Sequence, residues 1–185
     1  MPVNATNDNL GLKAHNFRLL DVSGKMITLD DIVGKNGTVI AFICNHCPYV
    51  IAIAERLNKE AEALRKLSIN TVAIMSNDVI QYPEDSYKNM KVFSKKYNFI
   101  FPYLYDETQE VAKKYEAMCT PDIFGFNKDR VLCYRGRLDS AVMNSDNKKI
   151  DRDLYNAMIK IKIDGKGPSK QYNSFGCSIK WKHYE

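Results

Sequence analysis

Apolar and polar residues follow two different periods along this chain, and together they predict alternating strands and helices. The continuous run of β-branched, aliphatic and aromatic residues at positions 38–43 is typical of a buried central strand, and the largely apolar residues 70–76 predict a second one. Between these runs, apolar residues recur at helical spacing from residue 50 to residue 64, with charged residues on the opposite side. This pattern predicts an amphipathic helix that begins at Pro48.

The segments on either side of this unit carry the same two periods. Residues 17–29 predict two short strands joined by a serine-glycine turn. A second helix is predicted after residue 76, because Met90, Phe93 and Tyr97 fall on one face of a helix. Residues 103–106 then predict a short strand.

The last third of the chain predicts two helices and a hairpin. Asp106 and Gln109, three residues apart, resemble a capping box, which predicts a helix over residues 107–118. Residues 121–126 and 131–136 predict an antiparallel hairpin around a polar turn. A last helix is predicted from four apolar residues at helical spacing: Ile150, Leu154, Met158 and Ile161.

This order of elements predicts the fold class. A parallel β-α-β unit followed by a helix, a hairpin and another helix indicates an α/β fold, with a mixed central β-sheet flanked by helices. An N-terminal β-hairpin precedes this unit. We expect one domain over residues 1–164 and an extended C-terminal tail, residues 165–185, packed on it, because the closing residues show no period.

Composition and charge remove several classes of function. The chain has 45% hydrophobic and 26% charged residues, and it has no apolar run near the about 18 residues that a membrane span needs. The first residues carry no secretory pattern, so we expect a cytoplasmic protein. The net charge is +5, but the lysines are spread over the helices, which argues against a nucleic-acid surface.

Candidate chemistry is concentrated in the stretch FICNHCPYV. Pro48 is favoured at the first position of a helix, which makes Cys47 the N-cap. Unpaired amides and the helix dipole at that point stabilise a thiolate, the reactive form of cysteine. His46 adds positive charge when it is protonated, and Asn45 turns the chain. Cys44 lies at the end of the strand and is a candidate second thiol that releases a partner bound to Cys47.

Several motifs in order resemble one known family over almost the whole chain. They are GLKAHNFRLLDVSGKMITLDDIVGKNGTVIAFICNHCPYV, SNDVIQYPEDS, FPYLYDETQEVAKKYEAMCTPDIFGF, YRGRLD and GCSIKWK. The chain resembles a peroxiredoxin-like branch of the thioredoxin superfamily, related to the alkyl hydroperoxide reductase and thiol-specific antioxidant proteins. The resemblance implies a thioredoxin-like fold and thiol redox chemistry in cell redox homeostasis. It also implies a cis proline at Pro121, after Thr120, that faces the active cysteine.

Two departures from that family leave the reaction open. Thioredoxins carry a second cysteine three residues after the nucleophile, but that position is Val50 here. The Pro-x-x-x-Thr-x-x-Cys pattern of peroxiredoxins is also absent, and the threonine and arginine of the peroxide pocket have no clear counterpart. The sequence therefore predicts a thiol oxidoreductase with Cys47 as nucleophile toward a disulfide or a peroxide, without choosing between them.

The partner thiol and a second class of function also stay open. Cys44 ranks first as the resolving thiol, Cys119 second because it precedes the cis-proline motif by two residues, and Cys177 in the tail third. Cys133 lies in an apolar run and is expected to be packed. The expected partner is a thiol or disulfide protein or a small redox molecule, with no cofactor or metal, and a homodimer is one open oligomeric state. The alternative is a redox-inactive or metal-binding interaction module on a thioredoxin scaffold.

Overall fold

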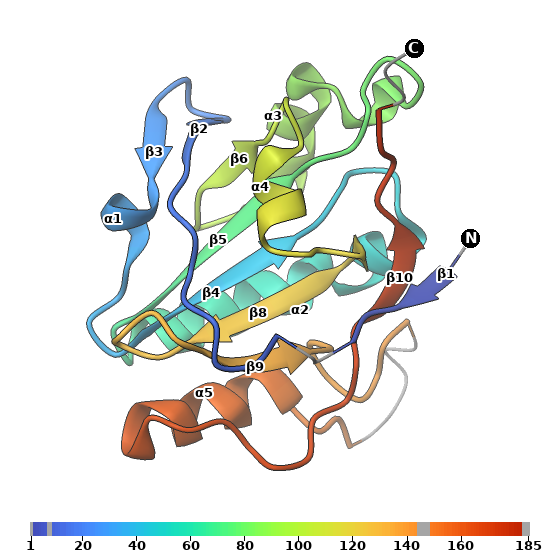
Figure 1. The fold of residues 1–185 in the computed structure, drawn as a ribbon. Coiled ribbons are helices and arrows are strands. Elements are labelled where there is room, and N and C mark those ends of the chain that lie inside the picture. The colour runs from blue at the N-terminus through green and yellow to red at the C-terminus, as the bar shows by residue number, and fades with distance from the viewer. Residues whose placement is uncertain (1, 7–8, 144–148, 183–185) are drawn as a thin grey trace.

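A mixed β-sheet forms the centre of the computed structural model, which describes residues 2–6, 9–143 and 149–182 (Figure 1). Its central strands β6, β5 and β4 are parallel, and each remaining neighbouring pair is antiparallel. The predicted N-terminal hairpin, the central strands and the later hairpin are confirmed. In spatial order the strands are β3 (Met26–Thr28), β2 (Arg18–Asp21), β6 (Tyr103–Tyr105), β5 (Ile69–Met75), β4 (Gly37–Phe42), β8 (Asp122–Phe126) and β9 (Leu132–Gly136).

Helices cover both faces of this sheet. Successive side chains of each strand point to opposite faces, and in the buried strands both sets are apolar, so each face needs a covering layer. On β4, Val39 and Ala41 pack in the core under the longer helices, whereas Ile40 and Phe42 pack in the core under the short ones. The longer helices are α2 (Pro48–Arg65), α3 (Tyr87–Lys96) and α5 (Asp153–Asp164), and the short ones are α1 (Leu29–Ile32) and α4 (Glu110–Lys114). The predicted α/β class with a mixed sheet flanked by helices is therefore confirmed.

Two helix predictions need correction. The helix expected over residues 107–118 is only α4, and Gln109 precedes it in a left-handed conformation with φ of 64°. Asp106 does not form a capping box with Gln109; instead its carboxylate accepts hydrogen bonds from the amides of Val111 and Ala112 at 3.3 and 2.9 Å. Asp106 thus caps the helix from three residues before the N-cap. Ile150 lies before the first residue of α5.

The two ends of the chain pair with each other beside the start of α2. Strand β10 (Phe175–Ser178) lies antiparallel between β1 (Pro2–Asn4) and β7 (Cys119–Thr120) (Figure 1). The sequence predicted the tail as extended but predicted neither β1 nor the pairing of β10. This pairing places Cys177 opposite Thr120. The C-terminal strand therefore lies over the cis-proline region.

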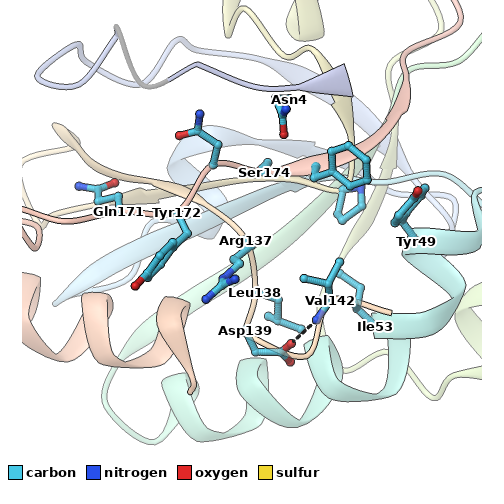
Figure 2. Close-up of a pocket in the computed structure, with 13 residues that line it drawn as sticks. Asn4, Tyr49, Ile53, Arg137, Leu138, Asp139, Val142, Gln171, Tyr172 and Ser174 are labelled. Atoms are coloured by element: carbon cyan, nitrogen blue, oxygen red, sulfur yellow. Dashed lines mark hydrogen bonds between the residues drawn. The ribbon is translucent and has the colours of Figure 1, made fainter. Parts of the chain in front are cut away.

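A cavity of about 530 Å³ opens next to this small sheet (Figure 2). It lies between the first turns of α2, the loop that follows β9, and the tail segment that leads into β10.

In the part of the chain that the structure describes, no helix has the length and apolar character that crossing a membrane requires.

Candidate functional site

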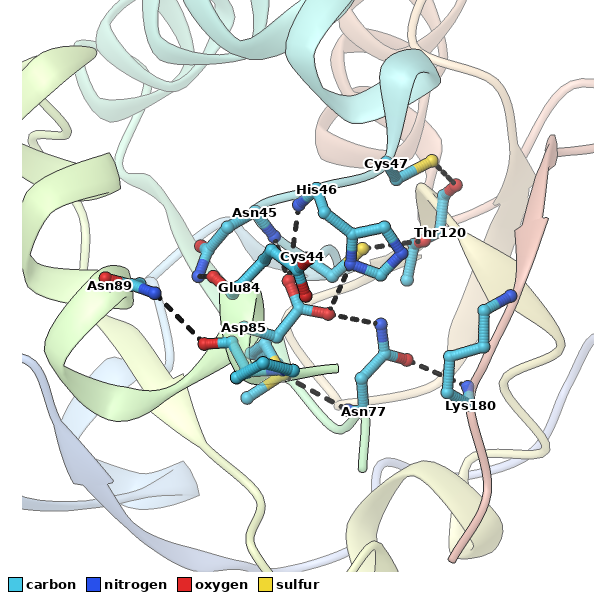
Figure 3. Close-up of polar contacts among 12 residues, drawn as sticks. Cys44, Asn45, His46, Cys47, Asn77, Glu84, Asp85, Asn89, Thr120 and Lys180 are labelled. Carbon is cyan, nitrogen blue, oxygen red and sulfur yellow. Dashed lines mark hydrogen bonds and ion pairs between the residues drawn. The ribbon is translucent and has the colours of Figure 1, made fainter. Parts of the chain in front are cut away.

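Cys47 is the N-cap of α2, as the sequence predicts, and Pro48 follows it at the first helical position. The backbone at Cys47 is extended, with φ of −68° and ψ of 121°, so the chain turns from the end of β4 directly into the helix. When protonated, the Cys47 thiol donates to the carbonyl oxygen of Thr120 at 3.0 Å (Figure 3). Cys47 is fully buried, because the strand β10 lies over this corner.

The environment of Cys47 favours its thiolate. The pKa of Cys47 is lowered to about 5, first because the Cys44 thiol donates a hydrogen bond to it. Burial acts in the opposite direction, while the thiol and amide of Cys177 and the amide of Val50 lower the pKa further. The start of α2 lowers the pKa of Cys47 through the Val50 amide, but Cys44 lowers it most. The sequence alone does not reveal this contribution of Cys44.

The two neighbouring thiols are held protonated. The pKa of Cys44 is raised well above its ordinary value by its hydrogen bond to Cys47, by burial and by the nearby Asp85. The pKa of Cys177 is raised to about 11, first by burial and then by its hydrogen bond to Cys47. One thiolate with two thiol donors is an arrangement that can carry out thiol–disulfide exchange, because that chemistry needs a thiolate with a second thiol close to it.

Replacing Cys44 by alanine is expected to raise the pKa of Cys47, since it removes the largest stabiliser of the thiolate. The measurement is the rate of iodoacetamide alkylation at Cys47 against pH, read by mass spectrometry of the Cys47 peptide. The wild-type midpoint is expected near pH 5, and the variant midpoint should move up by at least about one unit. Cys133→Ala is the matched control, and an unmoved midpoint in Cys44→Ala would contradict this assignment.

A buried carboxylate anchors the loop that carries the two cysteines. Asp85 is fully buried in the short 3₁₀ turn Pro83–Asp85, and one of its oxygens accepts from the amides of Asn45 and His46 at 2.7 and 3.2 Å. The other oxygen accepts from Nδ1 of His46 at 2.7 Å and from the side-chain amide of Asn77 at 2.8 Å (Figure 3). Four donors on one carboxylate fix the loop geometry.

His46 is held by this carboxylate and is therefore not placed as a base for Cys47. Its pKa is raised, first by the hydrogen bond to Asp85, with a further contribution from the charge on Cys47. The ring stacks on Tyr82 with the ring centroids 5.5 Å apart. Asn45 is fixed as well, since the Tyr103 hydroxyl donates to its side-chain oxygen at 3.0 Å.

The tail is fastened to the same region by its backbone. The Lys180 amide donates to the side-chain oxygen of Asn77 at 2.9 Å, and the Lys180 carbonyl accepts from the Asp78 amide and the Gln109 side chain. Its ammonium lies 5.6 Å from the centroid of the Tyr82 ring. Asn77 thus bridges the tail to Asp85, and through it to the cysteine loop (Figure 3).

The structure brings most of the predicted site residues together. The peptide bond between Thr120 and Pro121 is cis, as the family resemblance implies. The Thr120 hydroxyl lies 3.3 Å from the Cys44 sulfur. Cys119 differs from its neighbours, because its thiol donates to the Pro121 carbonyl at 3.4 Å and burial raises its pKa. Cys119 therefore does not join the group of thiols bonded to Cys47.

Sequence reasoning missed Asp85, Asn77 and Lys180. A signal for Asn77 was present, because β4 and β5 are parallel and the residues that follow them must lie at the same edge of the sheet. Asp85 and Lys180 reach the site only through a turn and a returning tail. No local period marks either of them.

Cys44, His46 and Asp85 offer three ligand atoms within 4.8 Å of one another, which is a geometry that can hold a metal ion. Each Asp85 oxygen, however, already accepts two hydrogen bonds. A metal ion bound by His46 Nδ1 must first break the hydrogen bond between His46 and Asp85. The arrangement therefore suits a structural anchor better than a metal site.

The central mixed sheet, the cysteine at the start of α2 and the cis proline beside it define a thioredoxin-like protein. A model of the AhpC/TSA family matches residues 10–135. The chain belongs to the AhpC/TSA family.

Several solved structures are similar to this chain over most of its length. An uncharacterized conserved protein from Geobacillus kaustophilus is 42% identical, with a TM-score of 0.93 over 100% of this chain and 98% of that one. A hypothetical protein from Sinorhizobium meliloti is 36% identical, with a TM-score of 0.88 over 97% and 98%. The thioredoxin domain of a thiol-disulfide oxidoreductase from Bacteroides vulgatus, 15% identical, has a TM-score of 0.63 over 82% and 96% and shares the fold. A search of curated proteins gave no match.

Proposed function

We propose that this protein is a thiol oxidoreductase in which Cys47 attacks a disulfide and Cys177 resolves the adduct. The observation that carries the proposal is the position of Cys47 at the start of α2, beside the cis Thr120–Pro121 bond. The thiols of Cys44 and Cys177, which lower its pKa to about 5, support it. At neutral pH such a cysteine is almost entirely thiolate. Family membership and the fold shared with a thiol-disulfide oxidoreductase support a redox role.

The reaction balances with one external reductant. The Cys47 thiolate attacks one sulfur of the substrate disulfide, which forms a mixed disulfide and releases the other half as a thiolate. Cys177, once deprotonated, attacks the Cys47 sulfur and releases the second half, leaving a Cys47–Cys177 disulfide. The substrate gains two electrons and two protons. A thiol or dithiol partner then returns both cysteines to the reduced form.

Two features favour Cys177 over Cys44 as the resolving thiol. A resolving cysteine must become a thiolate, and Cys44 is fully buried next to Asp85, with its pKa raised well above the ordinary value. Cys177 is only partly buried, and its pKa is about 11. It also lies on the short strand β10, outside the loop that Asp85 anchors, whereas Cys44 lies within that loop. This reverses the order that the sequence suggested.

The surroundings of Cys47 favour a disulfide over a peroxide as substrate. The resemblance to peroxiredoxins calls for an arginine beside the reactive sulfur, but no arginine forms a hydrogen bond to Cys47 among the described residues. Arg135 lies on β9, beside the strand that follows the cis proline, yet it is buried and pairs with Asp122 at 2.8 Å. We place the activity in cytoplasmic thiol redox homeostasis, where five free cysteines remain reduced.

Disulfide mapping tests both assignments. After one equivalent of a small disulfide, the wild-type protein is expected to form a Cys47–Cys177 bridge. Cys177→Ser should retain the mixed disulfide on Cys47 at least about tenfold longer, because no accessible thiol displaces it. Intact-mass and peptide mass spectrometry measure both species. Cys133→Ser is the control and should behave as wild type.

The outcomes separate the two claims. A Cys44–Cys47 bridge that forms in Cys177→Ser at the wild-type rate would show that Cys44 is the resolving thiol, with the nucleophile unchanged. Absence of any adduct on Cys47 would refute the oxidoreductase and favour a redox-inactive module on a thioredoxin scaffold.

A further inference from the structure

The cavity of about 530 Å³ beside β10 is large enough for a small organic molecule (Figure 2). Ligand sites in proteins have volumes of roughly 300–1,000 Å³ and combine apolar walls with a few polar groups. The lining residues of this cavity come from five separate parts of the chain: β1, the start of α2, Pro121 between β7 and β8, the loop after β9, and the tail that leads into β10. It therefore depends on the complete fold.

One end of the cavity adjoins the cysteine site. Tyr49 and Pro121 both line it. Tyr49 is two residues after Cys47, and Pro121 follows Thr120, whose carbonyl accepts the Cys47 thiol. Phe175 completes this end, and its ring contacts Tyr49 edge-on with the centroids 5.2 Å apart. Since Phe175 is the first residue of β10, a molecule in the cavity touches the strand that covers Cys47.

The walls near α2 are apolar. Ile53, Leu138 and Val142 line the cavity with the rings of Tyr49 and Phe175. Phe175 is 36% exposed, so part of this apolar surface faces the open space. Such walls favour the apolar body of a ligand over a strongly hydrated one.

A cation with unused donors lines the other end. Arg137 donates from Nε to Asp153 at 2.6 Å, and its two terminal nitrogens have no hydrogen-bond partner in the described part of the chain. The guanidinium lies 4.2 Å from the centroid of the Tyr172 ring, and the Lys170 ammonium lies 4.9 Å from the same ring. Figure 2 shows Arg137 between Tyr172 and Leu138 in the cavity wall.

The acidic group in the lining does not pair with Arg137 and leaves its terminal nitrogens available. Asp139 binds Arg56 through both carboxylate oxygens, at 2.7 and 3.3 Å, and one of these oxygens also accepts from the amides of Ala141 and Val142. Its charge is therefore balanced within the protein. Arginine donors held in a fixed fork are well suited to a carboxylate, which accepts two parallel hydrogen bonds.

We propose that this cavity binds the substrate of the proposed reaction, and that the substrate is a small disulfide with an apolar or aromatic body and a carboxylate. The proposal rests on Cys47 as the nucleophile. Arg137 binds the carboxylate, the apolar walls hold the body, and the disulfide reaches Pro121 and Cys47 when β10 moves. The Cys47 thiolate then bonds to one sulfur, and the other half leaves as a thiolate.

Two aromatic disulfides test this assignment. Dithiobis(nitrobenzoate) carries a carboxylate on each ring, and dithiodipyridine is neutral at pH 7. Both release thiols that absorbance measures directly. The quantity compared is the ratio of their second-order rate constants with the reduced protein at fixed ionic strength. Arg137→Gln is expected to lower the carboxylate-to-neutral ratio about tenfold, since it removes charged hydrogen bonds. Arg137→Lys should recover part of that loss.

Further variants make the result decisive. Arg130→Gln removes an equal charge at an exposed pair with Asp30 and should keep the wild-type ratio. Lys170→Gln changes an exposed side chain and should lower the ratio about threefold, so the proposal stays testable if Arg137→Gln does not fold. A ratio that stays at the wild-type value in both Arg137→Gln and Lys170→Gln, or that falls equally in Arg130→Gln, would overturn the proposal. If neither reagent modifies Cys47, the proposed function itself fails.

Discussion

Replacing Cys47 by serine is expected to abolish the fast reaction of the protein with disulfides. At pH 6 a thiol with a pKa of about 5 is mostly thiolate, whereas an unperturbed thiol near 8.5 is ionised to less than about one per cent. Part of the rate advantage that this higher thiolate fraction gives is lost, because a thiolate of lower basicity is a weaker nucleophile. A net advantage of about tenfold remains at pH 6.

The measurement is a single-turnover reaction of the reduced protein with dithiodipyridine, followed by absorbance between pH 4.5 and pH 9. Wild type should show a fast phase whose rate rises through pH 5, and Cys47→Ser should lack that phase entirely. Cys133→Ser is the matched control, because Cys133 lies in β9 away from the helix start. A fast phase that persists in Cys47→Ser would assign the nucleophile to another cysteine.

The elements of the fold that depend on local pattern could be predicted from the sequence. Strand β4 and helix α2 carry an uninterrupted apolar run and a clear helical period, with a proline at the junction. Strands β1 and β10 could not be predicted, because each is short and becomes a strand only by pairing with residues far along the chain. Such pairing is a property of the tertiary structure.

Some features of the candidate site could likewise be predicted from local sequence signals, and others could not. Cys47 was identified from the strand end and Pro48, both of which are local signals. The origin of its lowered pKa was not, since the largest cause is a hydrogen bond from Cys44 across a turn. Likewise Asp85 lies thirty-eight positions from Cys47 in the sequence. It belongs to the motif SNDVIQYPEDS, but its contact with the cysteine loop emerges only where the 3₁₀ turn meets that loop.

Replacing Asp85 by alanine is expected to cost about 3–5 kcal/mol of the free energy of unfolding, the range seen when one partner of a buried charged network is removed. The substitution leaves two backbone amides, the His46 ring and the Asn77 side chain without their acceptor in a buried site. Each unsatisfied buried donor costs roughly 1–3 kcal/mol. Urea unfolding measures the change. Asp30→Ala, which removes an exposed carboxylate paired with Arg130, should cost less than about 1 kcal/mol.

The pH dependence of this difference identifies its source. Asp85 raises the pKa of His46 in the folded protein, so the stabilisation from that pair is fully present below the ordinary histidine pKa of about 6.5. It is lost as the pH rises through the raised value. The gap in unfolding free energy between wild type and Asp85→Ala should therefore narrow from pH 6 to pH 9, while the part that comes from the two backbone amides persists. A gap that stays constant over this range would show that the positive charge of His46 contributes nothing to the stabilisation by Asp85.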